Sequence, residues 1–446
     1  MNSNHPPRGL SLTQDPWPDA SEILASPLTI NSVALANRIV MGPMAALEPE
    51  QDGRPSEQTL AFLAERAKGG VGLIILGGTV ATTRAYRESR FQVLRFDEDR
   101  FVPDLKRLTA AVHAHRTPIF AELTASFGTM GKPAPGLPLI AASPKNVVVR
   151  KDRLQAGTYA PFDVPMPMPR AATLAEIHEI EQGMAMAAQR AQRAGFDGVE
   201  VASMMSYFLA SFLSPRTNWR TDEYGGTLEN RARILVNIVR LIREKTGPQF
   251  PIGLRIAANE HLDGGQGPEE FAAIARLVER EGLDYVALTD GNYESMDAVN
   301  VDAPTIVHGE ARVFREALSC RLILGGIHSL ANLARAVDDG YGDAVMLARQ
   351  LLADPEFAKK IGERRYDDLV LCDYNNSCSR RLMFGFPIRC ANNPRMGRES
   401  RHPGDRPPLR RVAKAPIERA VVSAAGSEGL IELVGKLAPK KMKQPR

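Results

Sequence analysis

Residues 322–349, LILGGIHSLANLARAVDDGYGDAVMLAR, contain the alternation of short apolar runs and an amphipathic segment from which we predict the architecture. The apolar run 322–324 ends in two glycines, and the segment 331–338 (ANLARAVD) has the apolar spacing that is typical of an amphipathic helix. A second apolar run, 344–347, follows a turn rich in glycine and aspartate. The stretch therefore predicts a strand–helix–strand unit, which is the building block of a parallel sheet.

The same alternation extends through most of the chain. Short apolar runs recur between longer segments with helical spacing, such as 60–67 and 235–242. The predicted strands are 38–41, 72–76, 118–123, 198–201, 252–256, 285–288, 322–324 and 344–347. Eight strands alternating with helices in about 340 residues predict an α/β protein with a TIM (β/α)8 barrel and N- and C-terminal extensions. An open doubly wound sheet is the alternative, but the glycine-rich loop that it needs after the first strand is absent from the sequence.

The segments outside this alternation divide the chain. We expect an N-terminal extension at 1–25, the barrel at 26–370, a separate segment at 371–399 and a basic tail at 400–446. Two further stretches, 128–169 and 203–226, lack periodicity and follow the third and fourth predicted strands. Both should lie at the C-terminal mouth of the barrel, where active sites form.

Composition limits the classes of protein that fit. The chain has 446 residues, of which 44% are hydrophobic and 24% are charged, as in ordinary globular proteins. No apolar run approaches the roughly 20 residues of a membrane span, and the N-terminus lacks an apolar signal core. Four cysteines cannot form a disulfide scaffold, so we expect a reducing, cytoplasmic location.

Charge is distributed unevenly along the chain. The formal net charge is +4, and from Ser400 onward eleven basic residues face four acidic ones. Such a tail either contacts nucleic acid or anionic lipid, or is simply a solvated end. We favour the solvated end and therefore expect neither a nucleic acid nor a membrane as a partner.

A phosphate site is indicated where the last two strands end. Gly325 and Gly326 follow the seventh strand, and Ala348 and Arg349 follow the eighth. Phosphate binding after these two strands recurs in barrels, and a guanidinium can hold an anion with two hydrogen bonds. The alternative is that the glycines only form a tight turn.

Five stretches of this sequence resemble the old yellow enzyme family of NADH:flavin oxidoreductases. The closer resemblance is to the branch that contains 2,4-dienoyl-CoA reductase and trimethylamine dehydrogenase. The stretches are NRIVMGPM (37–44), GFDGVEV (195–201), FLSPRTNWRTDEYGGTLENR (212–231), GG (325–326) and RQLLADPEF (349–357). The likeness extends from about residue 27 to residue 399.

The resemblance implies a barrel that binds FMN non-covalently at its mouth. It implies that Pro43, Met44, Ala45 and Gly77 lie against the flavin ring. Arg255, at the end of the fifth strand, would place a positive charge beside the pyrimidine part of the ring and stabilise the anionic reduced flavin. The phosphate would be held by the residues at the ends of the last two strands, Gly325, Gly326, Ala348 and Arg349. A buried ion pair inside the barrel is the alternative role of Arg255.

The sequence departs from the family after the fourth strand. Most members have a His-x-x-His or His-x-x-Asn pair there, and this chain has Ala202 and Met205. Tyr207 stands where the dienoyl-CoA reductase has a proton-donating tyrosine, so it is the candidate general acid. Packing against its neighbours is the equally weighted alternative. After the sixth strand, Tyr293 and Glu294 are candidate substrate residues, because Glu294 stands nearest to a family histidine.

A second departure lies on the third strand. Glu122 replaces the glutamine that meets the flavin pyrimidine edge in the family. An ionised carboxylate there would lower the flavin potential, unless Arg255 or burial compensates. Either the redox chemistry is tuned or flavin binding is relaxed.

The iron–sulfur motif of the branch is incomplete in this chain. Cys378 and Cys390 have the family spacing, but Leu371 and Tyr374 stand at the other two positions and Cys372 is one position out of register. We therefore expect no metal site and no [4Fe-4S] cluster here. The segment 419–425 resembles the first strand of a Rossmann domain without its glycines, so we interpret 400–446 as the remnant of a lost FAD/NAD domain.

Together these features predict an FMN-dependent oxidoreductase of the ene-reductase or dehydrogenase type. It would transfer hydride between flavin N5 and a small hydrophobic, unsaturated carbonyl-type substrate, with electrons from NAD(P)H directly or from a separate reductase. The alternatives are a redox-neutral flavin isomerase and a barrel that has lost redox chemistry and serves as a binding subunit. Family members are often homo-oligomers, and the sequence leaves this open.

Overall fold

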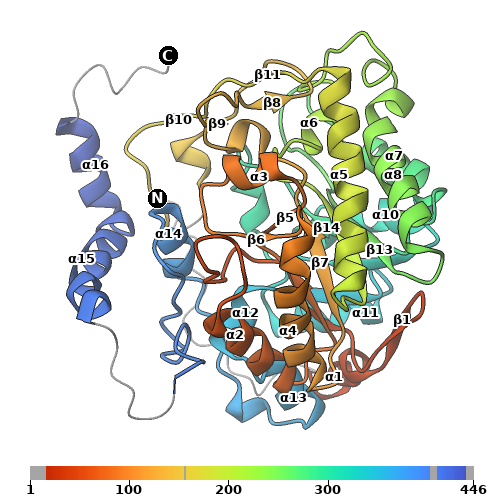
Figure 1. The fold of residues 1–446 in the computed structure, drawn as a ribbon. Coiled ribbons are helices and arrows are strands. Elements are labelled where there is room, and N and C mark those ends of the chain that lie inside the picture. Colours follow the sequence, from red (N-terminus) through yellow and green to blue (C-terminus); the bar gives the residue numbers. More distant parts are fainter. Residues whose placement is uncertain (1–16, 155–156, 402–408, 438–446) are drawn as a thin grey trace.

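The computed structural model describes residues 17–154, 157–401 and 409–437, and it confirms the predicted barrel. Eight parallel strands close in the order β12-β13-β14-β15-β16-β3-β4-β7, surrounded by helices (Figure 1). All eight predicted strands are present, with ends within two residues of the prediction. They are β3 (Ile39–Met41), β4 (Leu73–Leu76), β7 (Ile119–Leu123), β12 (Gly198–Ser203), β13 (Ile252–Ala257), β14 (Tyr285–Thr289), β15 (Arg321–Leu324) and β16 (Ala344–Leu347).

The outer helices form where the sequence has helical spacing and capping residues. In α7 (Leu228–Thr246), the Thr227 side chain accepts a hydrogen bond from the Asn230 N–H, and the apolar residues between Leu235 and Ile242 face the barrel. Burying each such aliphatic side chain contributes about 1.5–3 kcal/mol. The other principal helices are α2 (Glu57–Lys68), α4 (Val102–His113), α5 (Leu174–Arg193), α8 (Pro268–Glu279), α10 (Glu310–Ala317), α11 (Leu330–Asp338), α12 (Arg349–Ala353) and α13 (Phe357–Gly362).

The N-terminal end of the barrel is closed by apolar packing. The hairpin of β1 (Leu28–Ile30) and β2 (Val33–Leu35) packs against inward-facing residues such as Val40 and Phe120. Helix α1 (Trp17–Ala25) packs against α11 and α13, and its Leu24 is fully buried. The predicted extension at 1–25 is therefore, over residues 17–25, part of the barrel's cover.

The opposite end is the mouth, and it carries the predicted insertion. Residues 128–169 contribute the short strands β8 (Ile140–Ala141), β9 (Val148–Val149) and β10 (Val164–Pro165), and β11 (Arg170–Ala171) pairs with β8. These strands lie at the top of the view in Figure 1, with α3 (Thr83–Glu88) and α6 (Ala210–Leu213) nearby. The mouth is thus walled on one side by this insertion.

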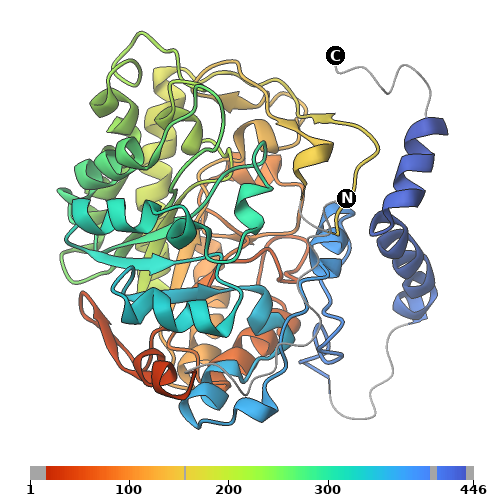
Figure 2. The same ribbon diagram turned by 180° about the vertical axis from the view of Figure 1, so that it is seen from behind.

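The C-terminal segment does not contain the expected strand. Helix α14 (Ser377–Met383) contacts α15 (Leu409–Ala425), which with α16 (Glu428–Leu437) stands beside the barrel in Figures 1 and 2. The prediction of a Rossmann-like strand at 419–425 is wrong, because these residues continue helix α15. Val422 and Ala425 are buried, one helical turn apart, and Arg380 donates a hydrogen bond to the Val422 carbonyl. The alanine-rich composition favours this helix over an unpaired strand.

None of the described helices combines the length and the apolar character that a membrane crossing requires.

Candidate active site

A crevice of about 510 Å³ opens at the mouth, between the ends of the last strands and the first. It brings together six of the ten predicted cofactor residues: Pro43, Arg255, Gly325, Gly326, Ala348 and Arg349. The remaining lining residues are Gly42, Thr289, Ile327, His328, Met346, Leu347, Gln350 and Tyr374.

One end of the crevice, which we call the phosphate corner, is formed by two glycines whose surroundings leave little room for a side chain. A Cβ on Gly325 would approach Met346 Cε to 3.0 Å and the Leu288 carbonyl oxygen to 3.1 Å. Gly326 has a φ of +76°, a left-handed conformation that other residues seldom adopt, and it packs against Pro304. The glycines therefore leave the backbone exposed to the crevice.

Arg349 supplies the positive charge of the phosphate corner. Its guanidinium donates to Asn376 Oδ1 at 2.6 Å and lies 3.0 Å from His328 Nε2. Burial and the neighbouring Arg349 lower the pKa of His328 to about 4. His328 is therefore neutral at neutral pH, and it accepts a hydrogen bond from Arg349 rather than adding charge.

Tyr374, from the segment 371–399, completes this corner. The guanidinium of Arg349 lies 4.7 Å from the ring centroid of Tyr374, and the Tyr374 ring is 4.3 Å from that of His328. Tyr374 occupies one of the two positions where the iron–sulfur motif has its missing cysteines. Cys372, Cys378 and Cys390 are free thiols, and burial raises the pKa of Cys372 to about 11.

The other end of the crevice contains a buried polar layer that spans β7, β12 and β13. Arg255 Nη1 donates to Glu122 Oε2 at 3.1 Å, so the ion pair that the sequence offered as an alternative is present. Glu122 is in register with Glu200 on the neighbouring strand. Burial raises the pKa of Glu122, and burial together with Glu122 raises that of Glu200. Arg255 balances one carboxylate, and Glu200 is the one that carries a proton.

Two of the predicted substrate residues line a second cavity, which we call the side pocket. It holds about 600 Å³ and is lined by Met205 and Glu294 together with residues of the mouth insertion such as Lys145. Glu294 is paired with Arg216 at 2.7 Å, and both side chains are mostly buried. Ala202 does not line this cavity: it is buried beside Arg255, with which it is in register.

Tyr207 lies among aromatic rings at the mouth. Its ring centroid is 5.3 Å from Phe127 and 6.3 Å from Tyr293. Met205 and Ser206, directly before it, have φ values of +54° and +59°, which cost about 1–3 kcal/mol each and are typical of functional loops. Burial, and then Tyr293, raise the pKa of Tyr207 well above its ordinary value. The phenol is therefore protonated at every physiological pH.

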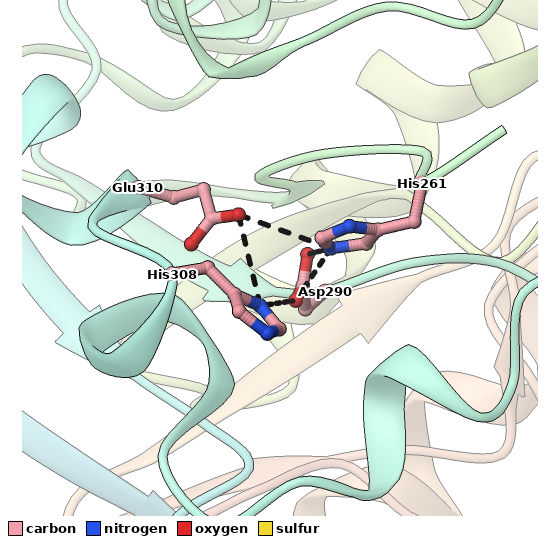
Figure 3. A group of neighbouring side chains, drawn as sticks. All are labelled: His261, Asp290, His308 and Glu310. Atoms are coloured by element: carbon pink, nitrogen blue, oxygen red, sulfur yellow. Dashed lines mark hydrogen bonds and ion pairs between the residues drawn. The ribbon is translucent and has the colours of Figure 1, made fainter. Parts of the chain in front are cut away.

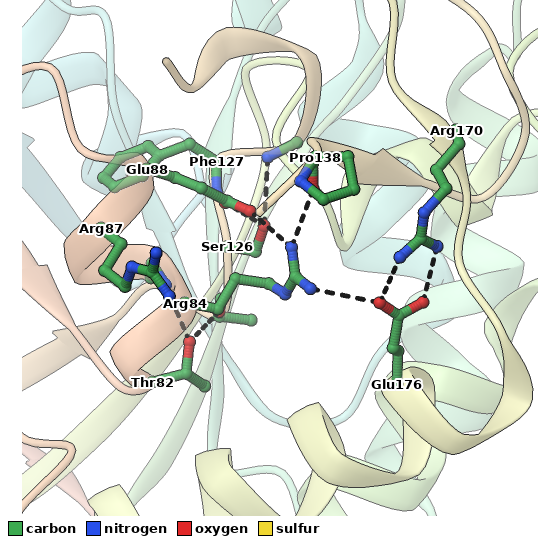
Figure 4. A network of polar contacts seen from close by, with 12 residues as sticks. Thr82, Arg84, Arg87, Glu88, Ser126, Phe127, Pro138, Arg170 and Glu176 are labelled. Carbon is green, nitrogen blue, oxygen red and sulfur yellow. Dashed lines mark hydrogen bonds and ion pairs between the residues drawn. The ribbon is translucent and has the colours of Figure 1, made fainter. Parts of the chain in front are cut away.

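A network of charged side chains fixes the loop that carries Phe127 (Figure 4). Glu88 accepts hydrogen bonds from Ser126 Oγ at 2.6 Å and from the Phe127 N–H at 3.2 Å. Arg84 joins Glu88 to Glu176, at 3.1 Å from each. Glu176 in turn caps the N-terminus of α5. The network thus connects an outer helix to the ring against which Tyr207 packs.

The other four predicted cofactor residues lie outside the lining of the crevice. Gly77 packs against the backbone of Pro43 and Met44, but Met44, Ala45, Gly77 and Glu122 do not line the crevice itself. Sequence reasoning missed three residues of the site, His328, Tyr374 and Arg216. His328 lies two positions after Gly326, and Arg216 lies in the longest family-like stretch, so the position of each in the sequence was an indication of a role in the site. Tyr374 carried none, because its segment was interpreted as a degenerate cluster motif.

Comparison with known proteins agrees with this geometry. Residues 24–368 match the model of the NADH:flavin oxidoreductase / NADH oxidase family. The chain is 32% identical to an NADH oxidase of Thermoanaerobacter brockii over 406 residues, which is 89% of this chain and 58% of the relative. It is 30% identical to an NADPH dehydrogenase of Bacillus velezensis over 348 residues, which is 76% of this chain and 94% of the relative.

A solved structure of 2-naphthoyl-CoA reductase in complex with 2-naphthoyl-CoA is similar in fold. It superposes with a TM-score of 0.75 at 27% identity, covering 85% of this chain and 58% of the other. The chain thus spans little more than half the length of several relatives that it matches.

Proposed function

The chain belongs to the NADH:flavin oxidoreductase / NADH oxidase family of flavin oxidoreductases, to which old yellow enzyme belongs, and on this premise we infer that it is an FMN-dependent reductase of unsaturated carbonyl compounds. NAD(P)H is the proposed electron donor. One observation carries the proposal: a single crevice at the mouth contains the glycines and Arg349 of the phosphate corner together with the Arg255 guanidinium, and Tyr207 lies near enough to Arg255 and Glu122 for their charges to act on its phenol.

The residues of the crevice fit FMN. Exposed glycine backbone and the Arg349 guanidinium suit a phosphate group. At the other end, the Arg255 Nε is buried and has no hydrogen-bond partner in the described part of the chain. A buried donor without a partner costs about 1–3 kcal/mol, so an acceptor at this place would be bound favourably.

The proposed chemistry divides between the cofactor and the protein. FMN, when bound, supplies or accepts a hydride at its N5 position. Arg255 holds a positive charge at the ring end of the crevice, and its pairing with Glu122 moderates that charge. Tyr207 holds a proton on its phenolic oxygen and donates it to the substrate carbon opposite the hydride.

The side pocket supports a substrate that is mainly apolar. Its walls include Met204, Met205 and Phe271, whereas the charges of Glu294 and Arg216 neutralise each other. The similarity to the 2-naphthoyl-CoA reductase supports an aromatic or otherwise conjugated acyl group. We therefore propose a hydrophobic, conjugated carbonyl compound as the substrate class.

An absorbance spectrum of the purified chain, followed by two half-reactions, tests the proposal. We expect a flavin spectrum from non-covalent FMN, bleaching by NADH or NADPH under anaerobic conditions, and reoxidation by a conjugated enone or cinnamoyl ester. A protein that stays colourless after incubation with FMN would refute the proposal. Conversion of an isomerisable enone without NAD(P)H consumption would instead establish redox-neutral isomerisation.

A further inference from the structure

A cluster of two histidines and two carboxylates lies outside the crevice and has no part in the proposed chemistry. We call His261, Asp290, His308 and Glu310 the histidine–carboxylate cluster (Figure 3). His261 comes from the loop after β13, and Asp290 follows directly after β14. His308 follows the short helix α9 (Pro304–Val307), and Glu310 is the first residue of α10. Three separate segments of the mouth therefore meet at this point.

The ligand-type atoms of the cluster are spaced as a metal site requires. His261 Nε2 lies 2.8 Å from Asp290 Oδ2 and 3.8 Å from Glu310 Oε1. His308 Nδ1 lies 3.5 and 3.9 Å from the same two oxygens, and all four atoms lie within 4.8 Å of one another. Ligand atoms of a tetrahedral site with bonds of about 2.0–2.1 Å are roughly 3.3 Å apart. Small rotations of the side chains would bring the four atoms to that spacing.

Burial and charge indicate that a cation belongs here. The Asp290 side chain is completely buried and that of Glu310 is 2% exposed, whereas the two histidines are partly exposed. Glu310 Oε2 has no hydrogen-bond partner within the described residues. Two neighbouring buried carboxylates are unfavourable unless positive charge lies beside them, and either a metal ion or protonated imidazoles can supply that charge. A divalent ion with two neutral imidazoles would make the cluster electrically neutral.

We propose that His261, Asp290, His308 and Glu310 bind one divalent transition-metal ion of the Zn²⁺ class in a closed, structural site. Imidazole nitrogen with carboxylate oxygen is a ligand set that Zn²⁺ accepts in tetrahedral geometry, and four protein ligands leave no open position for catalysis. It is the only group of at least three His, Cys, Asp or Glu side chains with this proximity in the described part of the chain.

A metal ion at this position would brace the wall of the crevice. Thr289, next to Asp290, lines the crevice, and Pro304 at the start of α9 packs on Gly326 of the phosphate corner. The Ala303 N–H also donates to the Gly326 carbonyl. The ion would therefore tie the loops after β13 and β14 to the helix that supports the phosphate-binding glycines. We expect it to raise the melting temperature and not to take part in hydride transfer.

Metal binding to the full-length protein tests this inference. The protein is stripped with EDTA, dialysed and titrated with Zn²⁺ by calorimetry, and its melting temperature is measured with and without the ion. We expect one equivalent bound at micromolar or tighter affinity and a higher melting temperature, since an ion that binds only the folded state stabilises it. Co²⁺ difference spectra against the metal-free protein should show the d–d bands of a tetrahedral oxygen and nitrogen site.

Two variants and a matched control locate the site. His308→Gln and Glu310→Gln should weaken Zn²⁺ binding at least about 100-fold, more than the 10–100-fold loss typical of outer-shell partners. His113→Gln removes a histidine that pairs with one aspartate, Asp197, at 2.8 Å, and should bind Zn²⁺ as the unmodified protein does. Equal binding by all three variants would overturn the inference.

Measurements on the unmodified protein test the inference without depending on the folding of any variant. Absence of stoichiometric Zn²⁺ binding, or Co²⁺ spectra with the intense charge-transfer bands of thiolate ligands, would also overturn the inference. The second result would point to the cysteines of the 371–399 segment.

Discussion

The two ends of the crevice differ in how closely they follow the family. The phosphate corner has Gly325, Gly326 and Arg349, which the family resemblance leads us to expect there, with His328 and Tyr374 around them. The opposite end, along β7 and β12, has Glu122 in place of a glutamine and Ala202 and Met205 in place of the substrate-binding pair.

The difference follows from what each end does with its ligand. A phosphate in this corner would be held by backbone N–H groups and one guanidinium, so its binding would depend on two glycines at which an added Cβ would make tight contacts. The β7–β12 end meets the ring and the substrate through side chains, which can change without disturbing the strands that carry them. One end is thus fixed by the fold, and the other is free to define the chemistry.

The largest effect that would test this division is expected at Tyr207. Tyr207→Phe removes the proposed proton and leaves the ring packed against Phe127. We expect reoxidation of the reduced protein by an enone to slow by about 10²–10⁴-fold. Reduction by NAD(P)H should stay within about twofold, since the phosphate corner and Arg255 are unchanged. Stopped-flow absorbance of the flavin measures both half-reactions.

Tyr293→Phe is the matched control, because the two tyrosines are neighbours with rings 6.3 Å apart. It should slow reoxidation far less than Tyr207→Phe. An equal decrease of the reoxidation rate in the two variants would mean that both tyrosines are needed for proton donation, and not Tyr207 alone.

At the phosphate corner, Arg349→Ala should weaken FMN binding by about 10–100-fold. A hydrogen bond to a charged group contributes about 1.5–3 kcal/mol, and the loss of the guanidinium also exposes the Tyr374 ring. Quenching of flavin fluorescence during titration measures the dissociation constant. Arg349→Lys keeps the positive charge but not the planar guanidinium. Its affinity for FMN should therefore lie between that of the unmodified protein and that of Arg349→Ala. Unchanged FMN affinity in Arg349→Ala would show that the FMN phosphate does not bind at this corner.

A smaller effect, on the reduction potential of FMN, is expected from a substitution in the polar layer at the opposite end of the crevice. Glu122→Gln removes the carboxylate that pairs with Arg255 at 3.1 Å, so the positive charge near the ring is no longer offset. We expect the reduction potential of bound FMN to rise by roughly 20–40 mV, which corresponds to about 1–2 kcal/mol for a two-electron couple.

Glu200→Gln should leave the FMN potential nearly unchanged, because burial and Glu122 already raise the pKa of Glu200 and favour its neutral form. A potential that responds to Glu200 and not to Glu122 would place the ionised carboxylate on the other strand.

The sequence was sufficient for the barrel and for the grouping of Gly325, Gly326 and Arg349 at one crevice, and insufficient for the contacts around them. Strands such as β16 were predictable because apolar runs bounded by turns recur with helices between them. Gly325 and Arg349 were predictable because each is adjacent to a strand end. The Arg216–Glu294 pair joins residues 78 positions apart, and the Tyr374–Arg349 contact depends on the path of a loop. The pattern of neighbouring residues in a sequence does not indicate contacts between residues that are far apart along the chain.

In the segment 419–425, by contrast, the local sequence pattern predicted a strand where the structure has a helix. Two adjacent valines and a later glycine resembled a strand and its turn, but strand formation needs a neighbouring strand to pair with. No such strand is available beside α15 among the described residues, and helix α14 provides an apolar and hydrogen-bonding surface instead.

The smallest expected effect concerns the network that connects α5 to Phe127 at the β7 end. Hydrogen bonds from Arg170, with help from Thr173, lower the pKa of Glu176 to about 2 despite partial burial. Its folded pKa lies below the ordinary value of 4.5, so this stabilisation is complete above about pH 4.5 and disappears as the pH falls toward 2. Glu176→Gln should therefore reduce the free energy of unfolding by about 1 kcal/mol at pH 7, after allowance for solvent screening, and by much less at pH 3. Urea unfolding at the two pH values measures the difference. A deficit of equal size at both pH values would mean that the amide disturbs the helix cap itself, and that charge at Glu176 contributes nothing to holding this end of the crevice.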